Sequence, residues 1–204
     1  MNFLGHALLA RHGSDDFLFG NLIADGIKGA ALTALSTEVA CGVRHHRRVD
    51  AFVDHHAIVL QLRQDAPREH RRVIGIALDM MWDHFLSQQL ADQREVDALV
   101  ERSYGVLRKR SLPARLEAML IALVEGDWLR AYGDFAFTCR AIAGVGRRLS
   151  GPNRLAASIP WLEQEYASIN AAFVALWPEL DEHFVPSGTR AWSEVSRVRR
   201  VTSE

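Results

Sequence analysis

The chain has 204 residues, a formal net charge of -1, 49% hydrophobic residues and two cysteines, Cys41 and Cys139. This composition is typical of a globular protein in a reducing compartment, and it excludes wholesale disorder, a disulfide scaffold and a four-cysteine zinc site. No run reaches the ~20 apolar residues of a membrane span and the near-zero net charge gives no general attraction to nucleic acid, so we expect a cytoplasmic protein without a membrane or nucleic-acid partner.

Apolar residues recur at the three- and four-residue spacing of a helix face along almost the whole chain. The first helix carries Phe3, Leu4 and Leu8, and Ser14 caps a second helix that ends near Gly29. The sequence shows neither strand-like alternation of convincing length nor a hairpin turn. Further helices are expected from Ser36 past Val59, from Pro67 to about Leu90, over 94–110, 114–126, 127–149 and 153–177, and after Pro178.

These elements predict one compact all-α domain over residues 1–185. The tail over residues 186–204 contains four arginines and begins Pro-Ser-Gly-Thr. We expect this basic tail to be weakly ordered. Eight of the nine histidines lie in the first 84 residues, so candidate functional residues concentrate in the N-terminal part.

Side chains that commonly bind metals lie four residues apart on three expected helices. Residues at this spacing share a helix face, with Cβ atoms ~5–6 Å apart. Mixed carboxylate and imidazole ligands suit Mn, Fe, Mg or Zn. The pairs are Asn21 with Asp25, His46 with Asp50, and Asp79 with Asp83, while Asp54 extends the second row by one turn and His84 follows the third.

Asp79 and Asp83 lie in a strongly apolar segment, where a carboxylate is costly unless it is paired, hydrogen-bonded or bound to a metal. Two carboxylates on one face repel each other unless a cation lies between them. One interpretation is ion pairing with arginines such as Arg47 or Arg71. With Asp25, His46 and Asp50 added, a shared divalent metal site becomes the preferred interpretation.

Three arginines surround the possible ligand His46. Arg44, Arg47 and Arg48 could form a solvated basic helix face, but arginines beside a metal also suit hydrolysis of a phosphate ester. The metal would generate hydroxide, and arginine would stabilise charge on the phosphoryl oxygens. His6 lies on an apolar helix, where a histidine is more often part of the core than a ligand.

Four segments of the chain occur in a telling order and spacing. They are Met1-Asn2-Phe3-Leu4-Gly5-His6, Gly20-Asn21-Leu22-Ile23-Ala24-Asp25, His46-Arg47-Arg48-Val49-Asp50-Ala51-Phe52-Val53-Asp54, and Leu78-Asp79-Met80-Met81-Trp82-Asp83-His84-Phe85-Leu86. Together they resemble the acyl carrier protein phosphodiesterases, well over residues 1–90 and more loosely beyond. The resemblance implies an all-α, HD-domain-like metal phosphodiesterase, although the His-Asp order that names HD enzymes is reversed here in Asp54-His55 and Asp83-His84.

The resemblance further implies the reaction. Members hydrolyse the phosphodiester that joins 4′-phosphopantetheine to a serine of holo acyl carrier protein, usually with Mn²⁺, and we keep Fe²⁺ and Mg²⁺ as further possible metals. The matched metal-type positions are Asp25, His46, Asp50, Asp79, Asp83 and His84, with His6, Asn21 and Asp54 as possible supporting residues.

The residues and the resemblance together give a mechanistic hypothesis. One or two ions held by Asp25, His46 and Asp79 or Asp83 activate water. Arg47 and Arg48 neutralise the phosphodiester, and His84 or His45 protonates the leaving serine. Because carrier proteins are acidic, a basic docking face is expected, and its binding should weaken as salt rises. The candidates are Arg44, Arg47, Arg48, Arg68, Arg71 and Arg72, or Arg140, Arg147, Arg148 and Arg154.

Two other functions fit the sequence. The protein could be a phosphohydrolase of a nucleotide or another small phosphodiester, which would turn over a free diester without any carrier protein. It could instead be a non-catalytic helical domain that binds acidic partners, with its carboxylates in structural ion pairs and no stoichiometric metal. The oligomeric state stays open.

Overall fold

Helices form all of the regular secondary structure in the computed structural model, which describes residues 1–29, 32–89, 93–149, 151 and 153–185. Within these residues there is no strand, which confirms the predicted all-α class. The tail that we expected to be weakly ordered, 186–204, lies outside the described residues. The elements are α1 (Phe3–Leu9), α2 (Asp15–Leu22), η1 (Ala24–Gly26), α3 (Thr37–His55), α4 (Ala57–Asp65), α5 (Ile74–Gln89), α6 (Gln93–Arg108), α7 (Glu117–Glu125), α8 (Trp128–Ala131), α9 (Phe135–Arg148), η2 (Ala156–Ser158), α10 (Ile159–Gln164) and α11 (Tyr166–Phe184).

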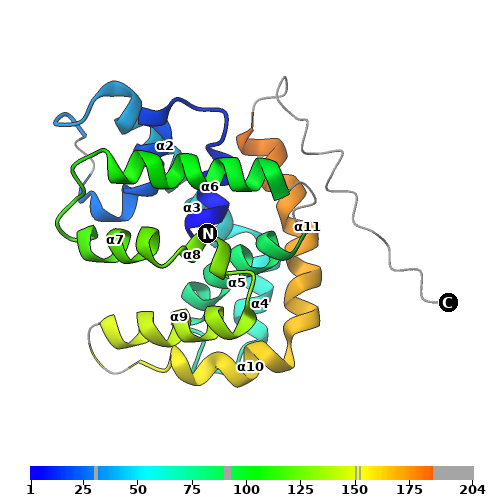
Figure 1. Ribbon diagram of the computed structural model, residues 1–204. Coiled ribbons are helices and arrows are strands. Elements are labelled where there is room, and N and C mark those ends of the chain that lie inside the picture. Colours follow the sequence, from blue (N-terminus) through cyan, green and yellow to red (C-terminus); the bar gives the residue numbers. More distant parts are fainter. Residues whose placement is uncertain (30–31, 90–92, 150, 152, 186–204) are drawn as a thin grey trace.

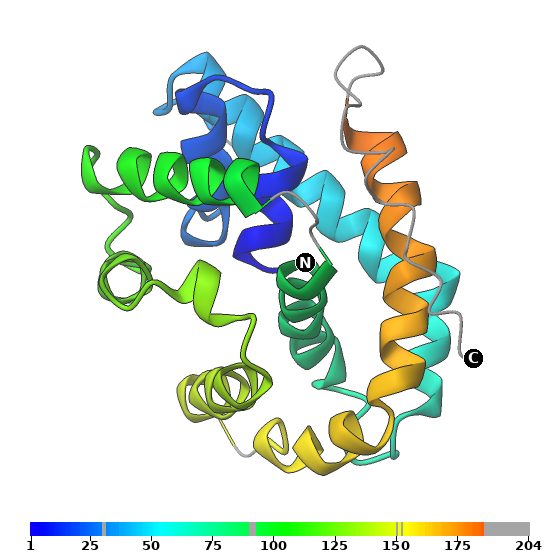
Figure 2. The same ribbon diagram turned by 45° about the vertical axis from the view of Figure 1, so that its right-hand side comes forward.

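The helix α5 lies at the centre, with α11 on one side and α7, α8 and α9 on the other (Figures 1 and 2). Its sequence is apolar around most of its circumference, as expected for a helix covered on all sides. Trp82 and Met81 are fully buried, and Phe85 is 1% exposed. One connected cluster of buried apolar residues extends from Met1 to Val185. No helix of the described part is long and apolar enough to cross a membrane.

Two glycines allow α2 and α3 to pack with their backbones in close contact. A Cβ atom at Gly20 would lie 2.0 Å from the carbonyl oxygen of Val39, and one at Gly42 would lie 2.0 Å from that of Phe17. Any larger residue would force the helices apart, because such distances are far shorter than van der Waals contact. This packing sets the position of His46 on α3 relative to Asp25, which follows α2.

Several predicted helices are interrupted where a residue caps the next helix. The helix expected from Ser36 past Val59 breaks at His56, whose backbone is extended and whose Nδ1 accepts a hydrogen bond from the N–H of Ile58. The helix expected over 127–149 breaks before Asp134, which caps α9 through the N–H of Ala136. The segment expected to be helical from Pro67 enters regular α-helix only at Ile74, and the one over 153–177 is divided between η2, α10 and α11.

Pro178 lies inside α11, contrary to our expectation of a new helix after it. A proline removes one backbone hydrogen bond and usually kinks or ends a helix. Here the neighbouring residues Leu176 and Leu180 are completely buried, and Trp177 is 8% exposed. Burial of such side chains contributes roughly 1.5–3 kcal/mol each, so packing of this face outweighs the lost hydrogen bond.

Candidate metal centre and cavity

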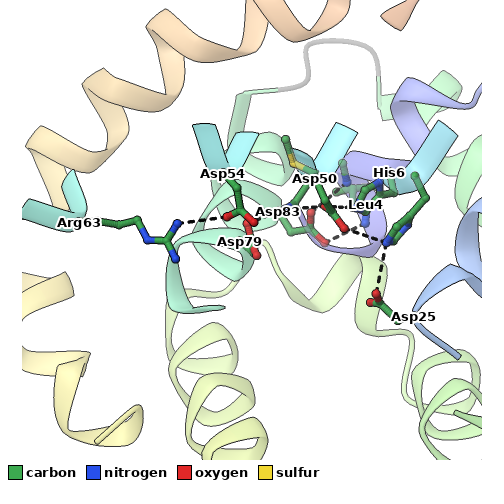
Figure 3. Close-up of polar contacts among 11 residues, drawn as sticks. Leu4, His6, Asp25, Asp50, Asp54, Arg63, Asp79 and Asp83 are labelled. Carbon is green, nitrogen blue, oxygen red and sulfur yellow. Dashed lines mark hydrogen bonds and ion pairs between the residues drawn. The ribbon is translucent and has the colours of Figure 1, made fainter. Parts of the chain in front are cut away.

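His6, His46 and Asp50 form a cluster in which each residue offers a possible ligand atom within 4.8 Å of the others. Asp50 connects the two imidazoles, because its Oδ1 lies 3.0 Å from His6 Nε2 and its Oδ2 lies 3.1 Å from His46 Nε2. The two rings stack with their centroids 3.7 Å apart. Figure 3 shows His6 and Asp50 side by side, with Asp25 beyond them.

The elements place these residues in a simple way. His46 and Asp50 are one turn apart on α3, as the sequence predicts, and α1 brings His6 against them. Asp25 lies on η1, and its Oδ1 is 3.4 Å from His46 Nε2. Arg47 holds the segment after η1 through its Nη1, which donates to the carbonyl oxygen of Gly29, and its Nη2, which donates to that of Ile27.

Burial and the carboxylates oppose each other in setting the protonation of this cluster. Burial lowers the pKa of His46, but the carboxylates of Asp25 and Asp50 outweigh it and raise this pKa to about 9. Burial and the neighbouring His46 lower the pKa of His6 to about 3. Burial favours the neutral acid at Asp50, yet the two histidines hold its pKa well below its usual range. In the metal-free cluster the two carboxylates therefore favour the charged form of His46, and burial favours the neutral form of His6.

The donor set fits a divalent cation. His46 Nε2 is buried and lies near two carboxylates, but among the described residues it has no hydrogen bond of good geometry. A cation bound there would replace the proton, since an imidazole must be neutral to bind a metal. Two imidazoles with one or two carboxylates are suitable ligands for Mn²⁺, Fe²⁺ or Zn²⁺.

Asp79 faces the same region from α5. It lines the cavity described below, and its Oδ1 lies 2.5 Å from the amino nitrogen of Met1, which is 3.4 Å from Asp50 Oδ1. Burial raises the pKa of the Asp79 carboxyl, against the effect of that amino group. The fold thus brings four residues of the predicted site close together: Asp25, His46, Asp50 and Asp79.

Asp83 lies one helical turn after Asp79, but its environment is different. It is completely buried, and its two oxygens accept hydrogen bonds from the backbone N–H groups of Leu4 and Gly5 at 2.8 and 2.9 Å. Burial raises its pKa to about 7, although both backbone donors favour the charged form. These two hydrogen bonds fix the N-terminus of α1, directly before His6.

The two histidines proposed to protonate the leaving group lie outside the cavity lining. His84 is buried, with Nδ1 2.8 Å from the carbonyl oxygen of Tyr132 and Nε2 2.7 Å from the hydroxyl of Tyr166. His45 packs edge-on against Phe17, and burial lowers its pKa to about 4. These contacts fix both side chains in the fold, and a proton-transfer role for either histidine stays a prediction.

The supporting residues also differ in their contacts. Asn21 is buried and its Nδ2 donates to His45 Nδ1 at 2.9 Å, so it orients the neighbour of His46. Asp54 is exposed, and its Oδ1 accepts from Arg63 at 3.3 Å (Figure 3). Of the three predicted supporting residues, His6 alone joins the cluster of possible ligands.

Asp50 of the cluster lines a cavity of about 540 Å³, together with Asp25 and Asp79, whereas His6 and His46 lie outside its lining. Its other walls come from α5, the start of α7, α8 and α9. Sequence reasoning missed these residues, because their apolar helical spacing is the same as that of ordinary core positions. The wall residues are Ile76, Met80, Leu116, Met119, Trp128, Tyr132, Phe137, Ala141, Gly144 and Val145.

The arginines nearest to this cavity are those of α9. Arg140, Arg147 and Arg148 line it and are also exposed, so they form part of its rim. Arg47 and Arg48, predicted to neutralise the phosphodiester, lie outside the lining; Arg48 stands 5.9 Å from the ring of Phe184.

The other predicted docking arginines also lie away from the cavity lining. Arg44 contacts Cys41, and Arg71 donates to the carbonyl oxygens of Gln64 and Ala66. Arg68 and Arg72 are exposed between α4 and α5. Of the two docking faces predicted from the sequence, the one on α9 therefore borders the cavity.

Comparison with known proteins agrees with the resemblance seen in the sequence. The chain is 34% identical over 187 residues to the acyl carrier protein phosphodiesterase of Photorhabdus laumondii, covering 89% of this chain and 94% of that protein. It is 33% identical to the enzyme of that name from Yersinia enterocolitica, covering 88% and 95%, and 31% identical to that of Shigella boydii, covering 100% and 98%. No solved structure matches the chain. Because the sequence model of the family matches residues 1–180, the chain belongs to the acyl carrier protein phosphodiesterase family.

Proposed function

We propose that this protein hydrolyses the phosphodiester between 4′-phosphopantetheine and the serine of holo acyl carrier protein, and releases apo carrier protein. The observation that carries this proposal is the cluster of His6, His46 and Asp50 beside a cavity that Asp50 lines and that is large enough for an organic ligand. Small-molecule sites are typically about 300–1,000 Å³ in volume. Family membership gives the substrate, and the cluster gives the chemistry.

The chain's own residues would divide the work. His6, His46, Asp50 and the adjacent Asp25 would hold a divalent ion, which we propose to be Mn²⁺. When bound, such an ion lowers the pKa of water and neutralises phosphoryl oxygens. The stacking of His6 on His46 and the bonds of Asp83 to α1 keep the ligand atoms in position. The ligands on adjacent helices support an HD-like arrangement, and the free Cys41 and Cys139 support a reducing, cytoplasmic location.

The first test uses mass spectrometry of purified holo carrier protein incubated with this protein and Mn²⁺. We expect the carrier to lose the mass of its phosphopantetheine arm and to remain intact otherwise, and we expect a chelator to prevent this loss. An unchanged carrier together with turnover of a free small diester would favour the small-substrate phosphohydrolase. No turnover and no bound metal would favour a binding domain.

We expect the α9 arginines to contribute to carrier docking. Replacing both Arg147 and Arg148 by serine should raise KM for the carrier roughly tenfold at low salt and leave kcat nearly unchanged, because long-range attraction acts mainly on encounter. The difference in KM between this variant and the unsubstituted protein should become smaller as the salt concentration rises, since exposed charges are screened beyond ~8–10 Å at physiological salt. Steady-state kinetics at two ionic strengths measures both effects.

Arg108 and Lys109 provide a matched control. They are also adjacent exposed cations at the end of a helix, α6, but they lie outside the lining of the cavity. Replacing both by serine removes the same charge, and we expect KM to stay within about twofold of the original value, as for exposed charges remote from a binding surface. Equal increases in KM for the two double variants would show that net charge, rather than the α9 rim, attracts the carrier.

A further inference from the structure

Apolar side chains from α5, α7, α8 and α9 form one wall of the cavity. Met80 of α5, Leu116 and Met119 at the start of α7, Trp128 of α8 and Phe137 of α9 contribute to it. A phosphodiester and its water need charged and polar partners, so this apolar area serves neither. Pockets lined in this way, with a few convergent polar groups, commonly bind small organic ligands.

This wall is held in place by specific contacts. Asp127 adopts a left-handed backbone conformation (φ 49°) between α7 and α8, and its carboxylate accepts a hydrogen bond from Tyr104. The same Tyr104 hydroxyl accepts from the N–H of Leu129, directly after Trp128. The rings of Trp128 and Phe137 then meet edge to face at 6.2 Å. The wall is therefore fixed before any ligand binds, which reduces the entropy cost of binding.

The polar groups of the cavity are arranged to orient a ligand. Asp25, Asp50 and Asp79 lie at the metal cluster, whereas the exposed Arg140, Arg147 and Arg148 lie at the rim. A phosphodiester at the cluster would have one substituent in the cavity and one directed to solvent. A serine on the surface of a folded carrier cannot enter a space of 540 Å³ with its protein attached, but a linear pantetheine chain can.

We propose that the apolar wall is the binding site for the pantetheine arm of the substrate. The carrier protein would remain at the α9 rim, and the wall would select the substrate by the length and bulk of its arm. This inference rests on the proposed function, because it takes the arm's identity from it. The methyl and methylene groups of the arm match the apolar wall, and the same cavity is lined by that wall and by Asp50 of the cluster.

Gly144 offers a way to fill this site without removing any contact. It lines the cavity, and a Cβ atom there would meet only the flexible end of Arg147, at 3.7 Å. Gly144→Ala and Gly144→Leu should both fold, because each improves helix propensity within α9. We expect Gly144→Leu to raise KM for holo carrier protein roughly tenfold or more, with a smaller effect of alanine, as for excess bulk in a pocket.

The second measurement is a binding titration, which does not depend on enzymatic activity. Pantetheine is titrated into metal-free protein, and binding is followed by tryptophan fluorescence, with Trp128 in the cavity wall as the expected reporter. Gly144→Leu should weaken this binding by a similar factor. Gly105→Leu is the matched control, because Gly105 lies in α6, has open space around its Cβ position and does not line the cavity. Its kinetics and pantetheine binding should stay unchanged.

The outcomes separate this inference from the proposed function. If the unsubstituted protein cleaves holo carrier protein but Gly144→Leu changes neither KM nor pantetheine affinity, the arm binds elsewhere and the inference is overturned. If pantetheine binds and Gly144→Leu blocks it while no carrier is cleaved, the arm site stands and the proposed reaction fails. Circular dichroism of each variant confirms the fold, and the alanine variant supplies the test if leucine unfolds the protein.

Discussion

Replacing Asp50 by asparagine is expected to lower kcat/KM for holo carrier protein about a thousandfold. Asp50 is the residue that contacts both His6 and His46, so its carboxylate is the common member of the candidate metal site. Asparagine keeps the shape but loses the negative charge, and it presents an amide nitrogen in place of one oxygen. If this weakens transition-state stabilisation by about 4 kcal/mol, the rate falls roughly 10³-fold.

The measurement combines kinetics with metal content. Asp50→Asn should keep its helical circular dichroism spectrum and lose bound metal after dialysis, as measured by elemental mass spectrometry. Glu38→Gln is the matched control, since it makes the same change on an exposed part of α3, and it should leave activity and metal content unchanged. Full activity of Asp50→Asn with metal retained would contradict the assignment of this cluster as the metal site.

The local geometry of the candidate site is the part that can be predicted from the sequence. His46 and Asp50 are one turn apart on a continuous helix, so periodicity alone brings them to the same face. Asp25 was also expected at the site. Its position depends on the contact between α2 and α3 at Gly20 and Gly42, which the sequence does not reveal directly. The all-α class could be predicted from the 3.6-residue spacing of apolar residues. The helix breaks at His56 and Asp134 could not, because each depends on one side chain that caps the next helix.

The sequence could not predict the contacts of residues whose partners lie far away in the chain. Asp79 and Asp83 are also one turn apart, yet Asp79 faces the cavity and Asp83 faces the N-terminus of α1, about 80 residues away in sequence. No local pattern distinguishes a carboxylate that binds backbone N–H groups from one that binds a cation. Arg47 is similar, because a guanidinium beside a ligand histidine satisfies two backbone carbonyls instead of a phosphate.

The second large effect concerns Asp83. Replacing it by asparagine should lower the free energy of unfolding of the metal-free protein by roughly 1–3 kcal/mol. One of the two buried N–H groups, of Leu4 or Gly5, would then face an amide NH₂ donor instead of an oxygen. An unsatisfied buried donor costs about 1–3 kcal/mol. The charge of Asp83 adds no further stability, because burial raises its pKa to about 7 and so disfavours the ionised form in the folded protein.

Urea unfolding followed by circular dichroism at pH 8 measures this change, because the carboxyl with its pKa of about 7 is then mainly ionised. Metal-free protein is used, since bound metal would add its own stabilisation. Asp65→Asn, at the exposed end of α4, is the control and should change stability by less than about 0.5 kcal/mol.

Metal binding distinguishes the two roles proposed for Asp83. As a residue that positions α1, and with it His6, Asp83 should affect metal affinity only indirectly, by about 10–100-fold, as residues that orient metal ligands do. The asparagine variant would then recover most of its kcat at saturating metal, in a temperature range where it remains folded. If activity stays lost at saturating metal while stability is unchanged, Asp83 contacts the ion itself, and α1 must be held in place by other contacts.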